Sequence, residues 1–223
     1  MKPQPWSHSR LSTFENCPRQ YYELNVAKSV QDVKGEAVIW GEQVHEHFER
    51  RLRDSVPLPV DLEKHEPFMA FLDAMPGKKL VEAKIALDQK MNPCQFFDKD
   101  VWYRGVIDYG RVNGKYARLV DHKTGKHHAK FGQLKLFALH TFAAYPEVEE
   151  IRAEYYWTQT LTTNGETYHR RDRWELWHEF LPALRQYAQA FVDDVWQPRQ
   201  SGLCAGFCPV TSCEFWRPRR KRL

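Results

Sequence analysis

The chain has 223 residues, 42% of them hydrophobic, and a formal net charge of +4. This length suits one catalytic-sized domain with a single core, and the modest charge is compatible with a nucleic-acid partner but also occurs in many ordinary enzymes. The N-terminus lacks an apolar export segment, and no stretch reaches the roughly 18 apolar residues of a membrane span. We therefore expect a soluble, cytoplasmic protein without a membrane partner.

Three helices are predicted in the first third of the chain. Ser12 followed by Glu15 resembles a capping box, and Pro18 should kink or split the short helix that it begins. A second helix is expected over about 36–53, with one apolar face formed by Val38, Gly41, Val44, His45, Phe48 and Leu52. The proline-containing residues 55–67 favour an irregular loop, and a short apolar helix should follow at about 68–75.

From Leu80 the hydrophobic period changes to two, which predicts strands at about 80–88, 101–112 and 116–123. Asn113-Gly114 is suited to the tight turn that joins the last two. A helix over 130–144 and a strand over 151–157 suggest a crossover, Asn164-Gly165 suggests a further hairpin, and a long helix from Trp174 to Val195, bent at Pro182, closes the chain. The predicted fold class is α/β, with a mixed central sheet flanked by helices.

Charged side chains gather at the ends of two of these strands. Asp108 ends the strand over 101–112, and the alternation of the next strand places Asp121 and Lys123 on one face. Two carboxylates can hold a hard divalent cation such as Mg²⁺ or Mn²⁺, and a lysine ammonium can orient water or stabilise the charge that develops in phosphodiester hydrolysis. An isolated acid-x-lysine triplet is more often a solvated strand end.

The order of motifs across most of the chain favours a functional site over a solvated strand end. The opening SRLSTFENCPRQYY, the helical GEQVH at 41–45, GVIDYG at 105–110, VDHKTGK at 120–126 and QLKLF at 133–137 follow one another in this order. Together they resemble the RecB-like branch of the PD-(D/E)XK nucleases, which includes CRISPR-associated spacer-processing exonucleases and their phage relatives. The resemblance implies a restriction-endonuclease-like core, a single nuclease domain over residues 1–223, and work in a bacterial or phage-infected cell.

The resemblance also assigns roles to individual residues. By position, the metal ligands would be His45, Asp108 and Asp121, with the backbone carbonyl of His122 as a further ligand. Gln133 is similar to the glutamine of the family's Q-x-x-x-Y motif, which contacts DNA or positions the lysine, although Phe137 replaces the tyrosine. Glu82 resembles a family glutamate near the metal. Without the motif context, His45 and Gln133 would be read as an ordinary histidine beside a core and an ordinary polar helix position.

Two other groups of histidines and cysteines have competing interpretations. His122, His127 and His128 could indicate a zinc site, but the side chain at 122 should point away from Asp121 and Lys123, so contacts with solvent or phosphate are favoured. An odd count of five cysteines argues against a disulfide framework. Cys94 is expected to be a small buried apolar residue.

The remaining four cysteines, Cys17, Cys204, Cys208 and Cys213, follow the layout in which RecB-like nucleases hold a 4Fe–4S cluster that joins the two ends of the domain. The C-terminal spacing is C-x3-C-x4-C, where the family often has C-x2-C-x5-C. Structural Zn²⁺ on the same thiolates, or unligated cysteines, are the alternatives.

DNA is the expected partner, as ends or single strands. A basic tail could bind phosphates or be a solubilising end, and several aromatic residues could stack on bases or belong to the core. The tail comprises Arg217, Arg219, Arg220, Lys221 and Arg222, and the aromatic candidates are Tyr21, Tyr22, Trp40, Trp102 and Tyr103. The resemblance implies a DNA exonuclease of recombination, repair or phage replication, with a recombination or replication protein as a further partner. A catalytically silent DNA-binding module and an RNA or nucleotide phosphoesterase are the alternatives.

Overall fold

The computed structural model describes residues 1–32, 34–127 and 130–218. The chain divides into two compact units, one formed by residues 35–177 and the other by the two ends, residues 1–34 and 178–223. That both belong to one nuclease domain stays a prediction. In the described part of the chain, no helix combines the length and apolar character that crossing a membrane would require.

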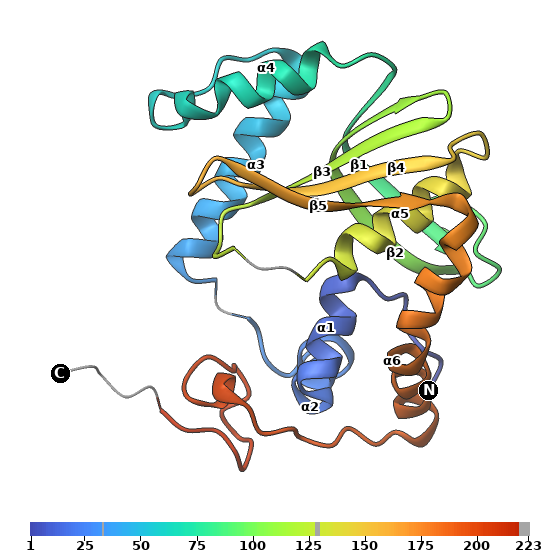
Figure 1. Ribbon diagram of the computed structural model, residues 1–223. Coiled ribbons are helices and arrows are strands. Elements are labelled where there is room, and N and C mark those ends of the chain that lie inside the picture. The colour runs from blue at the N-terminus through green and yellow to red at the C-terminus, as the bar shows by residue number, and fades with distance from the viewer. Residues whose placement is uncertain (33, 128–129, 219–223) are drawn as a thin grey trace. The chain divides into compact units, whose positions relative to one another are not determined.

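Residues 35–177 form a five-stranded sheet flanked by helices, as the α/β prediction required (Figure 1). The strands are β1 (Lys78–Asp88), β2 (Val101–Asn113), β3 (Tyr116–Lys123), β4 (Glu150–Trp157) and β5 (Thr162–His169). They lie in chain order, and all neighbours are antiparallel except β3 and β4, which are parallel. Helix α5 (Gly132–Ala144) makes the crossover between these two, so the predicted mixed sheet and crossover are confirmed.

Two layers of helices bury the two faces of this sheet. Helix α3 (Glu36–Asp54), the 3₁₀ helix η2 (Val60–His65) and α4 (Glu66–Ala74) share one apolar cluster with Tyr109, Val120 and Tyr156 of the sheet. The neighbouring Tyr155 points to the other face, where its hydroxyl donates to the Lys130 carbonyl just before α5. The 3₁₀ turn η3 (Arg170–Asp172) and the start of α6 (Arg173–Asp193) follow β5.

The two tight hairpins of the sheet, β2–β3 and β4–β5, differ in how well their turns were predicted. Gly114 and Lys115 make the two-residue loop between β2 and β3, and Gly114 has the positive φ of +56° that such a turn needs. Asn164-Gly165, in contrast, lies inside β5, and the preceding turn occupies residues 158–161, so the prediction of a hairpin at Asn164 was wrong. Gly165 is needed there because a Cβ would lie 2.1 Å from the Ala153 carbonyl oxygen of the paired strand.

The unit formed by the chain ends has an aromatic core. It contains α1 (His8–Asn16), α2 (Pro18–Tyr21), the π-helical turn η1 (Tyr22–Val26), most of α6 with Pro182 inside it, and the 3₁₀ turn η4 (Gly202–Cys204). The rings of Phe14, Tyr21, Tyr187, Phe191 and Trp196 pack together, and the hydroxyls of Tyr21 and Tyr187 are 2.6 Å apart. Tyr21 is thus a core residue rather than a surface for bases, and the same holds for Tyr103 in the sheet unit.

The first helix begins earlier than predicted. Its N-cap is Ser7, whose hydroxyl accepts the Arg10 amide, so the predicted capping box of Ser12 and Glu15 lies inside the helix. The split at Pro18 is confirmed, because Cys17 ends α1 and also caps α2, with Pro18 as the first residue of α2.

Candidate active site

Six residues that the sequence singled out come together in the unit of residues 35–177. The two-residue turn of the β2–β3 hairpin sets a register that pairs Tyr109 with Val120. Asp108 and Asp121, the next residue along each strand, therefore lie opposite each other. Helix α3 then adds a side chain from one face of the sheet, and α5 adds one from the other. The six are His45 on α3, Glu82 on β1, Asp108 on β2, Asp121 and Lys123 on β3, and Gln133 on α5.

His45 and Asp108 form the first of two connected clusters. The Nδ1 atom of His45 lies 3.3 Å from Oδ2 of Asp108 and 4.0 Å from Oε1 of Glu82. The same Oδ2 accepts the backbone N–H of His122 at 2.8 Å. His45, Asp108 and His122 each offer a ligand atom within 4.8 Å of the others, which is an arrangement able to hold a metal ion.

The imidazole of His122 is a member of this cluster that sequence analysis did not assign. Its side chain leaves the face of Asp121 and Lys123, as the alternation predicted, but it is only 2% exposed and packs against Phe48 and Tyr156. The prediction that it contacts solvent or phosphate was therefore wrong. Within the described residues its Nε2 atom has no hydrogen-bond partner. No signal in the sequence reveals this, because strand alternation gives the face but not what covers it.

The other two histidines of the predicted group lie apart from this cluster. His127 is exposed and its ring lies 4.7 Å from that of Trp157. His128 falls outside the described residues, as do Arg219, Arg220, Lys221 and Arg222 of the basic tail.

Asp121, Lys123 and Gln133 form the second cluster. The ammonium of Lys123 lies 2.5 Å from Oδ2 of Asp121 and donates to Oε1 of Gln133 at 2.9 Å. The amide of Gln133 in turn donates to Oδ1 of Asp121 at 2.7 Å. Lys123 also lies 5.1 Å from the ring centre of Tyr155. Each member of this triangle is fixed by the other two, so the ammonium is held in place although Lys123 is only partly buried.

Crowding of carboxylates dominates the electrostatics of the site. Burial and then the charge of Asp121 raise the pKa of Asp108 well above its ordinary value. Burial and the neighbouring Glu49 raise the pKa of Glu82 to about 7. Burial lowers the pKa of His45, which keeps its imidazole neutral and able to act as a ligand. A divalent cation would relieve the repulsion among these carboxylates, so the residues fit such a metal.

Glu82 reaches the site through an unusual backbone. Its neighbours Val81 and Ala83 pair with Tyr109 and Ile107, so Glu82 lies level with Asp108. Its φ of +46° is in the left-handed region, which costs roughly 1–3 kcal/mol for a residue with a Cβ. The period of two predicted for this strand is not kept throughout, because the consecutive residues Ile85, Ala86 and Leu87 are all buried.

An open cavity of about 660 Å³ leads to His45 and Glu82 from the side of α3. Its walls include Glu42, Glu46 and Glu49 on the helix and Thr124 after β3. Gly41 allows α3 to approach this closely, because a Cβ there would lie 2.9 Å from the Thr124 hydroxyl. The buried cluster is thus accessible to a ligand from solvent.

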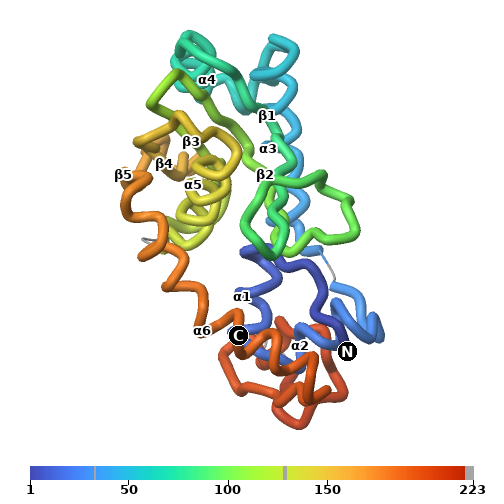
Figure 2. The backbone as a smooth tube through the Cα atoms, turned by 90° about the vertical axis from the view of Figure 1, so that its right-hand side faces the viewer, coloured from blue at the N-terminus to red at the C-terminus, as the bar shows by residue number. Residues whose placement is uncertain are grey.

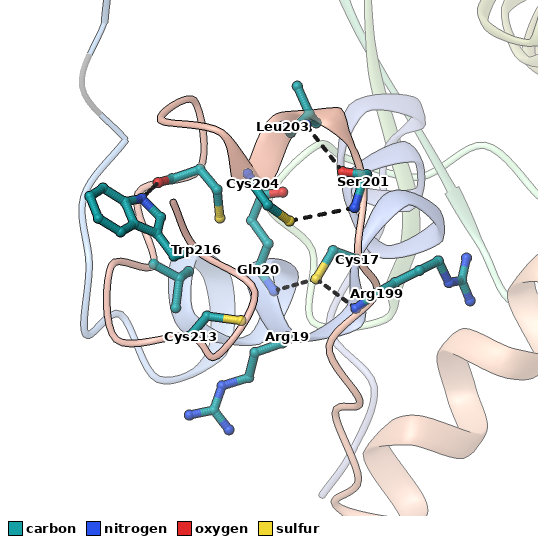
Figure 3. Close-up of a pocket in the computed structure, with 11 residues that line it drawn as sticks. Cys17, Arg19, Gln20, Arg199, Ser201, Leu203, Cys204, Cys213 and Trp216 are labelled. Atoms are coloured by element: carbon teal, nitrogen blue, oxygen red, sulfur yellow. Dashed lines mark hydrogen bonds between the residues drawn. The ribbon is translucent and has the colours of Figure 1, made fainter. Parts of the chain in front are cut away.

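A second candidate site lies in the unit formed by the chain ends, where all four predicted cysteines line one cavity (Figure 3). Backbone N–H groups of Gln20 and Arg199 point at the Cys17 sulfur at 3.5 and 3.4 Å, and that of Ser201 points at the Cys204 sulfur at 3.5 Å. All five cysteines are free thiols. Burial, together with the charges of the other three, raises the pKa of Cys208.

The structure refines two further predictions, on the burial of Cys94 and on the role of Arg217. Cys94 is half-buried rather than fully buried. Arg217, at the start of the basic tail, uses its guanidinium to donate to the carbonyls of Glu214 and Trp216, so it supports the turn around the cysteines.

Comparisons with known proteins agree with this fold. Residues 5–93 match the sequence model of the PD-(D/E)XK nuclease superfamily, a stretch that contains His45 and Glu82 and ends before Asp108. Two solved structures are similar over nearly the whole chain. A candidate exonuclease from Eubacterium rectale shares 12% identity with a TM-score of 0.53, covering 98% of this chain and 90% of that one. The protein SSO0001 shares 14% identity with a TM-score of 0.50, covering 96% and 88%.

At such identities the two structures establish the fold alone, and no curated protein matches the chain in sequence. Residues 5–93 are thus similar in sequence to the PD-(D/E)XK nuclease superfamily, and the chain shares its mixed sheet and flanking helices with the two solved structures.

Proposed function

We propose that the protein is a metal-dependent DNA nuclease of the RecB-like branch, which removes nucleotides from DNA ends or single strands during recombination, repair or phage replication. The observation that carries this proposal is the convergence of His45 and Asp108 with the triangle of Asp121, Lys123 and Gln133. Carboxylates beside a fixed ammonium are the groups that phosphodiester hydrolysis requires.

We assign Mg²⁺ or Mn²⁺ to His45, Asp108, Asp121 and the carbonyl of His122, because His45 contacts Asp108, the charge of Asp121 acts on both of them, and Glu82 is close by. When bound, such a cation polarises the phosphate and makes water a stronger nucleophile. The neutral state of His45 supports this assignment, since only an unprotonated imidazole can donate its lone pair. The raised pKa values of Asp108 and Glu82 support it too, because a nearby positive charge would favour both ionised carboxylates.

Lys123 would supply the positive charge nearest to the reacting phosphate. Its ammonium donates to Gln133 and pairs with Asp121, which leaves a further N–H to orient the attacking water or to stabilise the pentavalent transition state. Gln133 acts through Lys123 and Asp121 and is a positioning residue. Phe137 is buried and has no hydroxyl, so the contact that a tyrosine would make there is absent.

The test compares wild type with Lys123→Ala on end-labelled single- and double-stranded DNA, with Mg²⁺, Mn²⁺ or a chelator. We expect metal-dependent loss of the label in wild type and a decrease of at least about a hundredfold in the variant. Lys126→Ala, which removes an exposed lysine three residues later, is the matched control and should retain activity. A closed circular DNA should survive, since an exonuclease needs an end.

Three outcomes would contradict this proposal. Cleavage of RNA or free nucleotides in place of DNA would favour the phosphoesterase alternative. DNA binding without any cleavage would favour a catalytically silent module. Full activity of Lys123→Ala would remove the catalytic role from the triangle around Lys123.

We further propose that Cys17, Cys204, Cys208 and Cys213 hold a 4Fe–4S cluster. The four free thiols share one cavity, and the N–H groups directed at two of the sulfurs suit metal-bound thiolates. Burial and the charges of the other three cysteines raise the pKa of Cys208, and a bound cation would favour its thiolate. Anaerobic purification should give a brown protein with equal iron and acid-labile sulfide, both lost in Cys208→Ser. A colourless protein with stoichiometric zinc would overturn the cluster in favour of Zn²⁺.

A further inference from the structure

The connection between β1 and β2 carries an exposed aromatic pair that the site described above does not use. Residues 89–100 leave the sheet as a long excursion between the two strands (Figure 2). Phe97 is 77% exposed, and the neighbouring Phe96 is half-buried and packs edge-on against it with ring centres 5.1 Å apart. An apolar ring of this size facing water has no role in the core of the unit.

Two cations from the flanking strands lie over these rings. The ammonium of Lys84 on β1 is 5.9 Å from the centre of Phe96 and 5.8 Å from that of Phe97. The guanidinium of Arg104 on β2 is 5.3 and 5.6 Å from the same two centres. We call Lys84, Phe96, Phe97 and Arg104 the Phe97 patch. Its two positive charges are fixed within cation–π distance of an exposed ring.

Neither cation has a carboxylate partner among the residues that the structure describes, and the Nε atom of Arg104 is buried there without a hydrogen-bond acceptor. Two nearby acids, one at the end of β1 and one in the loop, accept backbone amides. Asp88 accepts the amides of Lys90 and Asn92, and Asp98 accepts the amide of Gln95. Since no ion pair within the described residues joins Lys84 or Arg104 to these two carboxylates or to that of Asp100, the positive charge of the patch is available to an external anion.

The patch shares its two strands with the candidate active site. Lys84 lies two residues from Glu82, and Arg104 lies four residues from Asp108 on the same face of β2. At about 3.3 Å per strand residue, Arg104 is roughly 13 Å along β2 from Asp108. A flexible polyanion bound at the patch could thus extend toward the carboxylates.

We propose that the Phe97 patch binds single-stranded DNA, with an unpaired base stacked on Phe97 and phosphates contacting Lys84 and Arg104. An exposed aromatic ring bordered by unpaired cations matches the chemistry of a single strand, which offers unpaired base faces and a charged backbone together. A duplex offers no unstacked base to the ring. The inference rests on the proposed nuclease function, since the patch would hold the strand that the active site cuts.

The test measures binding of a fluorescent oligothymidylate to the full-length protein by anisotropy, in a chelator so that no cleavage occurs. Phe97→Ala should weaken binding about tenfold, and Phe97→Trp should restore it, because stacking on one ring accounts for about this factor. Phe71→Ala is the matched control. Phe71 is also exposed and lies 5.0 Å from a guanidinium, that of Arg118, but belongs to α4, and its removal should leave affinity unchanged.

The salt dependence of DNA binding distinguishes the contribution of the two cations, Lys84 and Arg104, from that of the Phe97 ring. The double variant Lys84→Gln/Arg104→Gln should reduce the slope of log K against log salt by about 1.4, at about 0.7 for each phosphate contact, whereas Phe97→Ala should leave the slope unchanged. A blunt duplex should bind wild type and Phe97→Ala equally. Unchanged single-strand affinity in Phe97→Ala, or an equal loss on the duplex, would overturn the proposal.

The binding experiment is independent of catalysis. If the protein cleaves DNA but Phe97→Ala binds oligothymidylate as tightly as wild type, the proposed nuclease function stands and the proposed role of the Phe97 patch is wrong. A protein that cleaves nothing but shows the expected losses of affinity would retain the patch as a single-strand binding site and lose the nuclease function.

Discussion

Replacing Gln133 by alanine tests whether the triangle around Lys123 acts as a unit. The substitution removes the acceptor of the Lys123 ammonium at 2.9 Å and the donor to Asp121 at 2.7 Å. Each bond involves a charged group and contributes about 1.5–3 kcal/mol. If about 2 kcal/mol of this is expressed only in the transition state, where the ammonium must keep its position, kcat falls roughly thirtyfold.

Steady-state cleavage of a labelled oligonucleotide at saturating Mn²⁺, over a range of oligonucleotide concentrations, measures this effect. We expect a lower kcat for Gln133→Ala with KM changed less than threefold, because Gln133 acts through Lys123 and Asp121. Gln159→Ala is the matched control, since that glutamine also donates its amide close to the site, to the Thr124 carbonyl, without touching the triangle. An unchanged kcat in Gln133→Ala, or an equal loss in Gln159→Ala, would refute the reasoning.

Three further predictions concern stability. Asp108→Asn should raise the unfolding free energy in a chelator at pH 8, because the raised pKa of Asp108 means that its ionised form destabilises the fold, and should abolish thermal stabilisation by Mn²⁺; a lower melting temperature without metal would contradict this. His140 donates to the Ala86 carbonyl, and burial lowers its pKa from 6.5 to about 4, so the unfolded chain takes up a proton in this range before the folded one does. The wild type should therefore lose up to about 3 kcal/mol relative to His140→Gln as pH falls from 6.5 toward 4 in urea titrations, and parallel curves for the two proteins would count against it. Gly165→Ala should cost at least about 3 kcal/mol because its Cβ would meet the Ala153 carbonyl, whereas Gly125→Ala, with open space around it, should cost less than about 1 kcal/mol in the same chemical denaturation experiment.

The alternating and helical patterns were sufficient to predict most elements of the sheet unit, but not the bounds of β5. Residues 36–53, 101–112, 116–123 and 130–144 were expected to form the elements that the structure has there within one or two residues, because their apolar spacing is regular and their ends are marked. The hairpin at Gly114 then set the register that brings Asp108 to Asp121. Local sequence patterns were sufficient to predict this register because a hairpin pairs residues that are close in sequence.

Other features depended on contacts that no local pattern encodes. Asn164-Gly165 has the composition of a turn, yet the glycine serves a close backbone approach between β4 and β5. The burial of His122 depends on Phe48 and Tyr156, which lie far from it in sequence. The cation–aromatic contacts of Lys84 and Arg104 likewise need the return of the chain after the loop of residues 89–100. Tertiary packing decides each of these.

The left-handed backbone at Glu82 sets a limit on engineering this protein for thermal robustness. Glycine at that position would adopt a φ of +46° without steric penalty and would release roughly 1–3 kcal/mol of stored strain. The same exchange would delete a carboxylate 4.0 Å from His45. A variant selected only for a higher melting temperature would therefore bind cations less tightly. Selection for stability in this protein needs a measurement of metal binding or metal-dependent activity beside the melting temperature.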